Sequence, residues 1–401
     1  MYNSRLDGLT EYPFQRLNAL LAGVVPRVPP SDQVAMSIGE PQHAPPAMIR
    51  DLLVGDLAGW GKYPPTPGHA GFRAAVADWL TRRYALPAGL IDADNHVLPV
   101  AGSREALFMA AMLCVPPAKA GRTPTVLMPN PFYQVYFGAA VMAGAEPVFV
   151  PATRATGFQP DYATAPDDAL ARAAMAYLCT PANPQGTVAS IERLKAAITL
   201  ARAHDFVLVS DECYSEIYDD APPAGALQAC AALGGDLSNV LVFNSLSKRS
   251  SVPGLRSGFV AGDPELIARF NKLRSHGGAV QPVPVLDTAA ALWRDEAHVA
   301  ANRALYRAKF DDAAQILGGR FEFYRPGGGF FLWLNVGDGE RAARALWAEA
   351  GVKVLPGGYL ARPDARGINP GAPYIRVALV HDRARTADAV QRLRRTLENL
   401  T

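Results

Sequence analysis

The chain has 401 residues, more than the roughly 250–300 at which a single hydrophobic core stops growing, so two domains are expected. Hydrophobic residues make up 49% and charged residues 19%, and 39 basic against 37 acidic side chains leave a net charge of +2. This balance gives no support to a nucleic-acid-binding protein. The longest apolar run, at residues 106–115, is far short of the ~20 residues that span a bilayer, which argues against a membrane protein.

The N-terminal residues and the cysteines both indicate a cytoplasmic protein. Residues 1–17 lack the continuous apolar core of a secretory signal. The cysteines form no CxxC pair and show no metal-ligand spacing with histidine; they are Cys114, Cys179, Cys213 and Cys230. Reduced thiols are therefore expected, and no metal site is predicted.

The predicted elements divide the chain into three parts. Residues 1–45, which include the proline-rich stretch GVVPRVPPSD, are expected as an N-terminal segment that packs with the smaller domain. Residues 46–285 are expected as the large domain. Within it, short apolar runs alternate with helix-like stretches such as residues 191–205, which favours a mostly parallel, doubly wound sheet. The apolar runs lie at residues 125–129, 145–150, 175–180, 206–211, 239–244 and 257–262.

The last part of the chain has a different pattern. A long helical stretch at residues 285–317 leads to the apolar run 327–336, further helix and the run 374–380. Residues 286–401 are therefore expected as a smaller α+β domain. Trp293, Tyr306 and Phe310 form an aromatic stripe that is most simply helix core.

Polar clusters follow three of the predicted strands. Asn183 comes after residues 175–180, Asp211 ends the run at 206–211, and Lys248 follows 239–244. In open parallel sheets, ligands bind beyond the carboxyl ends of the strands, so we expect the three clusters to face one crevice.

The residue types in this crevice suit one cofactor. A buried lysine amine such as that of Lys248 is a nucleophile toward carbonyls, and a buried carboxylate such as Asp211 requires a cationic partner. A phosphate group would find donors in two places. One is the hydroxyls and guanidinium of Ser245, Ser247 and Arg256; the other is the backbone N–H groups of Ser103 and Arg104 at a helix start after Gly102.

Pyridoxal 5′-phosphate uses all of these groups, since it needs a lysine for its aldehyde, an acid beside its ring nitrogen and a phosphate cup. Asn183 and Tyr214 are expected to hydrogen-bond the phenolic oxygen of its ring. Tyr133 is expected to stack on the ring face.

The segment SLSKRSSVPGLRSGF resembles the lysine segment of class I and II (fold-type I) aminotransferases, and the resemblance covers nearly the whole chain. It implies the fold of these pyridoxal-phosphate-dependent transferases. Through SIGEP it implies that Gly39 lies at the substrate carboxylate, and through YIRVAL that Arg376 binds the α-carboxylate. Through KYPPTPG it implies that Tyr63 reaches the cofactor phosphate of the partner subunit in a homodimer with shared active sites. Lys248, Asp211 and Tyr214 would be the catalytic residues.

The chain most resembles bacterial N-succinyldiaminopimelate aminotransferases. The similar segments are YPFQRLNALLAG, SIGEPQHAPP, VLPVAGSREALF, PNPFYQVY, SDECYSEIYDD and NSLSKRSSVPGLRSGFVAGD. The resemblance implies transfer between glutamate and 2-oxoglutarate on one side and N-succinyl-LL-2,6-diaminopimelate and N-succinyl-2-amino-6-oxopimelate on the other, in lysine biosynthesis. The segment SHGGAVQPVPV and the glutamine of ANPQG depart from that subgroup, and the first lies where a substrate site is expected.

Other functions stay open at this point. An aminotransferase for an aromatic, aspartate or acetylornithine-type donor would share every motif, and only the residues that bind the distal carboxylate would differ. Arg274 and His276 are candidates for that role, with Arg27 a weaker one. A non-catalytic binding protein of the same fold is a remote alternative, because such a protein would be expected to lose Lys248 or Asp211. A dehydrogenase would need a glycine fingerprint after the first strand, and RPGGGFF lacks that spacing.

Overall fold

The computed structural model describes residues 1–400 and contains a large domain built on a seven-stranded sheet with the strand order β2-β8-β7-β6-β5-β3-β4. β8 runs antiparallel to β2 and β7, and the other neighbours along the sheet are parallel. The predicted mostly parallel, doubly wound sheet is confirmed. The strands are β2 (Val97–Val100), β3 (Thr125–Asn130), β4 (Glu146–Pro151), β5 (Ala173–Cys179), β6 (Val207–Asp211), β7 (Val240–Ser245) and β8 (Gly258–Gly262).

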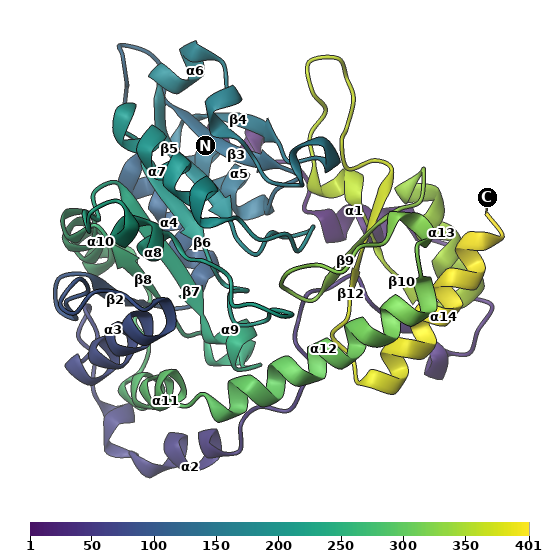
Figure 1. Ribbon diagram of the computed structural model, residues 1–401, viewed down its shortest axis with the longest axis horizontal. Coiled ribbons are helices and arrows are strands. Elements are labelled where there is room, and N and C mark those ends of the chain that lie inside the picture. The colour runs from purple at the N-terminus through teal and green to yellow at the C-terminus, as the bar shows by residue number, and fades with distance from the viewer. Residues whose placement is uncertain (401) are drawn as a thin grey trace.

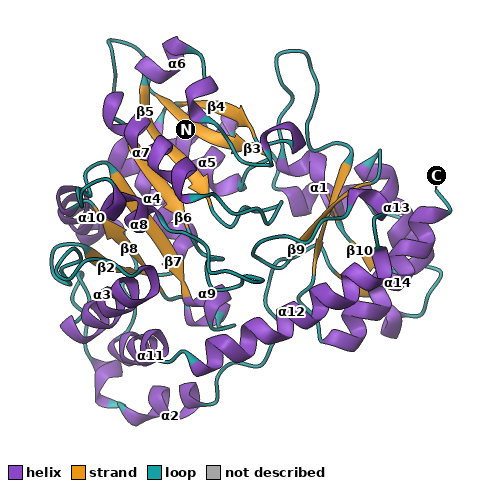
Figure 2. Ribbon diagram, viewed as in Figure 1, coloured by secondary structure: helices purple, strands orange, loops and turns teal. Residues whose placement is uncertain are grey.

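Helices cover both faces of this sheet, so its central strands are buried throughout (Figure 2). On one face lie α4 (Ser103–Cys114), α5 (Gln134–Ala143) and α10 (Pro264–Gly277), whose apolar side chains join one core cluster. On the other lie α3 (Ala70–Tyr84), α7 (Ile191–Ala203), α8 (Ala226–Ala232) and α11 (Val283–Arg294). The shorter helices of this domain are α2 (Met48–Gly55), α6 (Asp167–Ala171) and α9 (Leu246–Arg249).

The smaller domain is α+β, as predicted. An antiparallel sheet of order β11-β12-β9 packs with three helices. The strands are β9 (Phe331–Asn335), β10 (Val352–Lys353), β11 (Leu355–Pro356) and β12 (Tyr374–Ala378), and the helices are α12 (Ala297–Leu317), α13 (Gly339–Ala350) and α14 (Arg383–Glu398). Figure 1 shows α12 running along the lower edge of the molecule from the large domain toward the small one.

The N-terminal segment contacts both domains. Its strand β1 (Val34–Ala35) pairs in parallel with β10, and helix α1 (Pro13–Leu20) contacts β11. Farther toward the N-terminus, Arg5 donates to the backbone oxygen of Met142 at 3.2 Å, on α5 of the large domain. The segment therefore crosses from one domain to the other.

The predicted boundary between the two domains, after residue 285, falls inside helix α11 (Val283–Arg294). Leu286, Leu292 and Trp293 lie in the core cluster that α3 forms with the large sheet, so the helix packs with the large domain. Helical periodicity alone could not show this, because α11 and α12 read as one continuous amphipathic stretch. None of the helices in residues 1–400 is both long and apolar enough to cross a bilayer.

Candidate active site

A cavity of about 530 Å³ lies beyond the carboxyl ends of β5, β6 and β7 and is closed by the small domain and the N-terminal segment. It brings together the residues predicted for catalysis, for the cofactor and for the substrate α-carboxylate, with the exception of Tyr63. Those residues are Gly39, Ser103, Arg104, Tyr133, Asn183, Asp211, Tyr214, Ser245, Ser247, Lys248, Arg256 and Arg376. The carboxyl-end position is the one expected for ligands of such sheets.

Lys248 lies on α9, the single turn of helix that follows β7. Its Nζ donates a hydrogen bond to the backbone oxygen of Gly39 at 2.6 Å. Burial lowers the pKa of the Lys248 amine to about 8, because desolvation disfavours the charged form; the nearby Arg376 guanidinium acts in the same direction. The amine therefore loses its proton at a lower pH than an ordinary lysine, and its neutral form can attack a carbonyl.

Asp211 is the last residue of β6 and is buried. One carboxylate oxygen accepts from the hydroxyl of Tyr136 at 2.6 Å, and the other accepts from the backbone N–H of Cys213 at 3.3 Å. Burial raises the pKa of Asp211, while these hydrogen bonds oppose that rise by stabilising the ionised form. Among residues 1–400 no cationic side chain hydrogen-bonds this carboxylate, so it suits a ligand that brings a protonated nitrogen.

The hydroxyl, guanidinium and backbone donors expected at a phosphate lie along one wall. Ser245 Oγ and Ser247 Oγ are 2.9 Å apart, and Ser103 begins α4, whose N-terminal N–H groups face the cavity region without a side-chain cap. Arg256 donates to the backbone oxygens of Pro253 and Ala101 at 2.8 and 3.1 Å. At Gly102, φ is +82° and an added Cβ would lie 2.2 Å from Arg256, so only glycine allows this approach.

Arg376 on β12 closes the opposite wall. It donates to Asn183 Oδ1 at 3.0 Å and to the backbone oxygen of Ser37 at 2.7 Å, and it lies over the Phe331 ring at 4.4 Å. Its Nε is buried and has no hydrogen-bond partner among residues 1–400. Burial lowers the pKa of Arg376 to about 10, since no carboxylate compensates the buried charge. A buried guanidinium that lacks an acidic partner is well suited to bind the carboxylate of a ligand.

Aromatic side chains form the remaining wall. Tyr133 accepts a hydrogen bond from Arg104 Nε at 2.9 Å and packs edge-on against Tyr136 at 5.6 Å between ring centroids. Tyr214 packs against the rings of Phe330 and Phe331, and burial raises its pKa well above the ordinary tyrosine value. The flat ring of an aromatic cofactor fits between such surfaces.

Four predicted residues lie outside this cavity. Tyr63 is fully exposed on the surface of this chain. Arg274 is buried and binds Glu105 and the backbone oxygen of Ala279, so it does not face the cavity. His276 is exposed at the end of α10, and Arg27 is exposed and pairs with Glu349 at 2.5 Å. For Arg274 and Arg27, prediction as distal-carboxylate residues of this chain's site is wrong, because each already has an acidic partner elsewhere.

The site also includes residues that the sequence analysis did not predict, either in the cavity lining or bonded to a lining residue. Tyr136 on α5 does not line the cavity but donates a hydrogen bond to Asp211, and its position three residues after Tyr133 was an available signal. Tyr12, Phe14 and Glu40 come from the N-terminal segment, of which only Gly39 was predicted to lie at the site. The further lining residues are Pro13, Ile38, Gln134, Cys179, Cys213, Pro253, Gly254, Phe331, Leu355 and Leu360.

Comparison with known proteins agrees with this geometry. Residues 31–393 match the family described as aminotransferase class I and II. Among curated relatives, the 4-dedimethylamino-4-oxo-anhydrotetracycline transaminase OxyQ of Streptomyces rimosus is 33% identical over 91% of this chain and 94% of its own. The LL-diaminopimelate aminotransferase of Moorella thermoacetica is 31% identical over 98% of this chain and 97% of its own.

Solved structures give the same result. An aminotransferase from Neisseria meningitidis has a TM-score of 0.92 and 43% identity, with 98% of this chain and 99% of the other covered. A probable N-succinyldiaminopimelate aminotransferase from Thermus thermophilus has a TM-score of 0.81 and 25% identity, with 96% and 100% covered. The chain therefore belongs to the class I and II aminotransferases, which depend on pyridoxal 5′-phosphate.

Proposed function

We propose that this aminotransferase exchanges an amino group between glutamate and 2-oxoglutarate on one side and N-succinyl-LL-2,6-diaminopimelate and N-succinyl-2-amino-6-oxopimelate on the other. The sequence segments that resemble N-succinyldiaminopimelate aminotransferases support this substrate pair. The names of the Moorella and Thermus proteins support the diaminopimelate skeleton. The observation that carries the proposal is that a second guanidinium in the cavity besides Arg376, that of Arg104, forms no ion pair with a carboxylate among residues 1–400.

The cavity residues fit the cofactor as follows. Asp211 would hold the ring nitrogen, Asn183 and Tyr214 the phenolic oxygen, and Tyr133 one ring face. The phosphate would be held by the hydroxyls of Ser245 and Ser247, by Arg256 and by the α4 N-terminus at Ser103 and Arg104. When bound, pyridoxal 5′-phosphate supplies an aldehyde for the substrate amine and a ring that withdraws electrons from the substrate α-carbon.

The chain's own groups then perform the proton transfers. Arg376 binds the substrate α-carboxylate and orients the α-carbon, with Gly39 close to that carboxylate. The Lys248 amine, whose pKa burial lowers to about 8, would take the proton from the substrate α-carbon as a base and, once protonated, would act as the acid that gives a proton back. Asp211 in its ionised form keeps the ring nitrogen protonated. Two half-reactions, one for each substrate pair, complete a ping-pong cycle.

Arg104 is suited to the far end of a substrate with more than one carboxylate. Its Nε binds Tyr133, while its two terminal nitrogens make no hydrogen bond with any other residue in 1–400. Arg376 and Arg256 are assigned to the α-carboxylate and the phosphate. Arg104 is therefore the cavity guanidinium that remains for a distal carboxylate, a role for which its planar fork is well shaped.

Charge favours the succinylated compound over free LL-diaminopimelate. N-succinyl-LL-diaminopimelate carries three carboxylates and one ammonium, whereas the free compound carries two of each. The acidic side chains that line the cavity are Asp211, assigned to the ring nitrogen, and Glu40. A site with an unpaired guanidinium should prefer the more anionic substrate. Free LL-diaminopimelate is the second candidate, because the Moorella relative is named for it.

The test is the first half-reaction of the purified holoenzyme, followed by the change in cofactor absorption as each amino donor is added. N-succinyl-LL-diaminopimelate and glutamate should convert the cofactor at low concentration. Free LL-diaminopimelate, acetylornithine, aspartate and phenylalanine should require more. In the Arg104→Gln variant this preference should shrink, since the distal cation is lost. A free or aromatic donor that reacts best would overturn the substrate while leaving the aminotransferase assignment intact.

We also propose that two chains share their active sites in a homodimer. Val54, Leu57, Trp60 and Tyr63 are large exposed side chains within one stretch of ten residues around α2. Such a patch favours a subunit interface, and it would carry Tyr63 toward the partner's phosphate site.

A further inference from the structure

A chain of buried polar groups lies behind Lys248, away from the cavity. Lys309 Nζ is 2.7 Å from His43 Nε2, and His43 Nδ1 is 2.7 Å from Asn302 Oδ1. Asn302 Nδ2 in turn lies 3.2 and 3.3 Å from the backbone oxygens of Lys248 and Arg249. None of these three side chains lines the cavity, and the reaction described above uses none of them.

The contacts of Asn302 determine which atom donates and which accepts in each hydrogen bond of this network. Asn302 gives both contacts to carbonyl oxygens through its amide nitrogen, so its Oδ1 is an acceptor. His43 must then donate to it from Nδ1, which leaves Nε2 as an acceptor for the Lys309 amine. Lys309 also donates to the backbone oxygen of Leu379 at 2.9 Å, next to β12. Every contact is satisfied with a neutral His43.

The segment 39–43 consequently contacts Lys248 at two places, its side-chain amine and, through Asn302, its backbone carbonyl. At one end, the backbone oxygen of Gly39 accepts from the Lys248 amine at 2.6 Å. At the other, the His43 ring fixes Asn302, which binds the Lys248 carbonyl. The backbone oxygen of His43 adds a third link, since it accepts from Ser251 Oγ at 2.9 Å.

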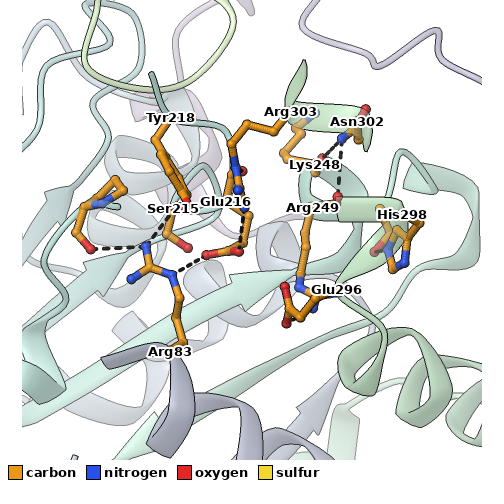
Figure 3. A network of polar contacts seen from close by, with 12 residues as sticks. Arg83, Ser215, Glu216, Tyr218, Lys248, Arg249, Glu296, His298, Asn302 and Arg303 are labelled. Carbon is orange, nitrogen blue, oxygen red and sulfur yellow. Dashed lines mark hydrogen bonds and ion pairs between the residues drawn. The ribbon is translucent and has the colours of Figure 1, made fainter. Parts of the chain in front are cut away.

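Helix α12 carries further contacts to the same loop (Figure 3). Glu296 pairs with Arg249 at 2.7 Å, and His298 Nε2 is 2.8 Å from Ser250 Oγ. Figure 3 shows His298 and Asn302 of α12, and Glu296 at its N-cap, beside Lys248 and Arg249. Because Lys309 lies on the same helix, α12 joins the loop of Lys248 to the small domain.

We propose that Asn302, His43 and Lys309 are positioning residues that fix the Lys248 backbone relative to the segment 37–43 and the small domain. The same segment supplies Ser37, whose backbone oxygen binds Arg376 at 2.7 Å. The network thereby ties the proton-transferring amine and the carboxylate-binding guanidinium to one short piece of chain. A misplacement of the reacting groups by about 1 Å can cost up to about a hundred-fold in rate.

The network also carries a consequence for pH. Burial lowers the pKa of Lys309 to about 7 and lowers that of His43 from its ordinary value. Asp382 faces Lys309 and opposes its shift, and the Tyr306 ring packs against both groups. When the pH falls below both pKa values, two protonated groups meet at the 2.7 Å contact and repel each other. The hold on Asn302 should therefore weaken on the acid side.

The test uses single-turnover kinetics of the glutamate half-reaction, which does not depend on the second substrate, together with hydrogen–deuterium exchange of the cofactor-free protein; kcat and KM here denote the maximal single-turnover rate and the half-saturating glutamate concentration. Asn302→Leu and His43→Phe should lower kcat about ten-fold with little change in KM, and should speed exchange at residues 246–251. His43→Asn should restore most of kcat, because its amide nitrogen takes the place of Nδ1 toward Asn302. Lys309→Met should make the acid-side loss of kcat smaller, leaving the part that follows from protonation of Lys248, with Lys272→Met as a control of equal charge change on an exposed lysine.

Two outcomes would overturn the proposal. One is unchanged kcat and unchanged exchange in both Asn302→Leu and His43→Phe. The other is a lower melting temperature in these variants with kcat and exchange at 246–251 preserved, which would assign the network to stability alone. If Asn302→Leu does not fold, the contrast between His43→Phe and His43→Asn decides the question, because both change the same position.

Discussion

At the scale of single residues, the cavity contains ionisable side chains whose charged forms are destabilised by burial. Burial lowers the pKa values of Lys248 and Arg376 and raises that of Asp211, so each charge is disfavoured until a ligand compensates it. Such opposed shifts within one cavity are typical of sites that perform proton transfer.

The pKa of Lys248 predicts how the cofactor-free protein captures pyridoxal 5′-phosphate. Only the neutral amine attacks the aldehyde, and the amine loses its proton as the pH rises through about 8. The rate of capture should therefore increase with pH up to about 8 and level off above it. Stopped-flow absorption across a pH series measures this rate. A rate that still climbs steadily above pH 9 would show that burial does not lower the pKa of Lys248.

Tyr136 predicts a second effect, through Asp211. Removal of its hydroxyl in Tyr136→Phe takes away a hydrogen bond to a carboxylate, worth about 1.5–3 kcal/mol, and raises the pKa of Asp211 further. The ring nitrogen then loses part of its counter-charge, and kcat should fall about ten-fold or more. Tyr177→Phe is the matched control, because Tyr177 is buried and stacks on Tyr136 but donates to the backbone oxygen of Leu107. Equal losses in both variants would contradict the role of Tyr136.

The sequence was informative for residues that follow strands and uninformative for residues that meet across elements. Asn183, Asp211 and Lys248 lie at strand ends, so the sheet topology alone brings them to one edge. Arg104 was predicted for its backbone N–H, whereas its side chain faces the cavity beside Tyr133, a contact between α4 and α5. Contacts of that kind depend on helix packing, which periodicity does not specify.

At the scale of elements, the turn between β2 and α4 sets the phosphate end of the cavity. Gly102 has a positive φ, and Arg256, two residues before β8, fills the space that a side chain would need. The antiparallel direction of β8 was not predicted, because an apolar run carries no information on strand direction. Yet that direction is what places Arg256, two residues before β8, beside the start of α4.

This arrangement predicts the effect of Gly102→Ala. The methyl group would displace the Arg256 guanidinium, and alanine is strained at a φ of +82°, so the phosphate would lose donors from both sides. The dissociation constant of pyridoxal 5′-phosphate should rise about ten-fold or more, which corresponds to about 1.4 kcal/mol. Gly89→Ala controls for strain alone, since Gly89 has a φ of +80° and open space around it. Equal cofactor affinity in the two variants would contradict a phosphate site here.

At the scale of the whole molecule, three parts of the chain meet at one cavity. The large domain supplies Lys248 and Asp211, the small domain supplies Arg376, and the N-terminal segment supplies Gly39. Tyr63, which the family resemblance assigns to the cofactor phosphate, remains on the outer surface of its own chain. Tyr63 would therefore reach an active site only in a dimer, where it would contribute to the site of the second chain.

Subunit complementation tests this sharing directly. Lys248→Ala should abolish transamination without unfolding the chain, and Tyr63→Phe should weaken cofactor binding and lower activity. In a mixed dimer of the two variants, one site receives Lys248 from the Tyr63→Phe chain and Tyr63 from the Lys248→Ala chain, so both residues of that site are native. Co-expression with two different tags, followed by sequential affinity purification, isolates that mixed dimer. Its activity should exceed the mean of the two parent dimers, and light scattering should give twice the mass of the chain. A mixed species with only the mean activity, or a fully active monomer, would show that Tyr63 does not act across an interface.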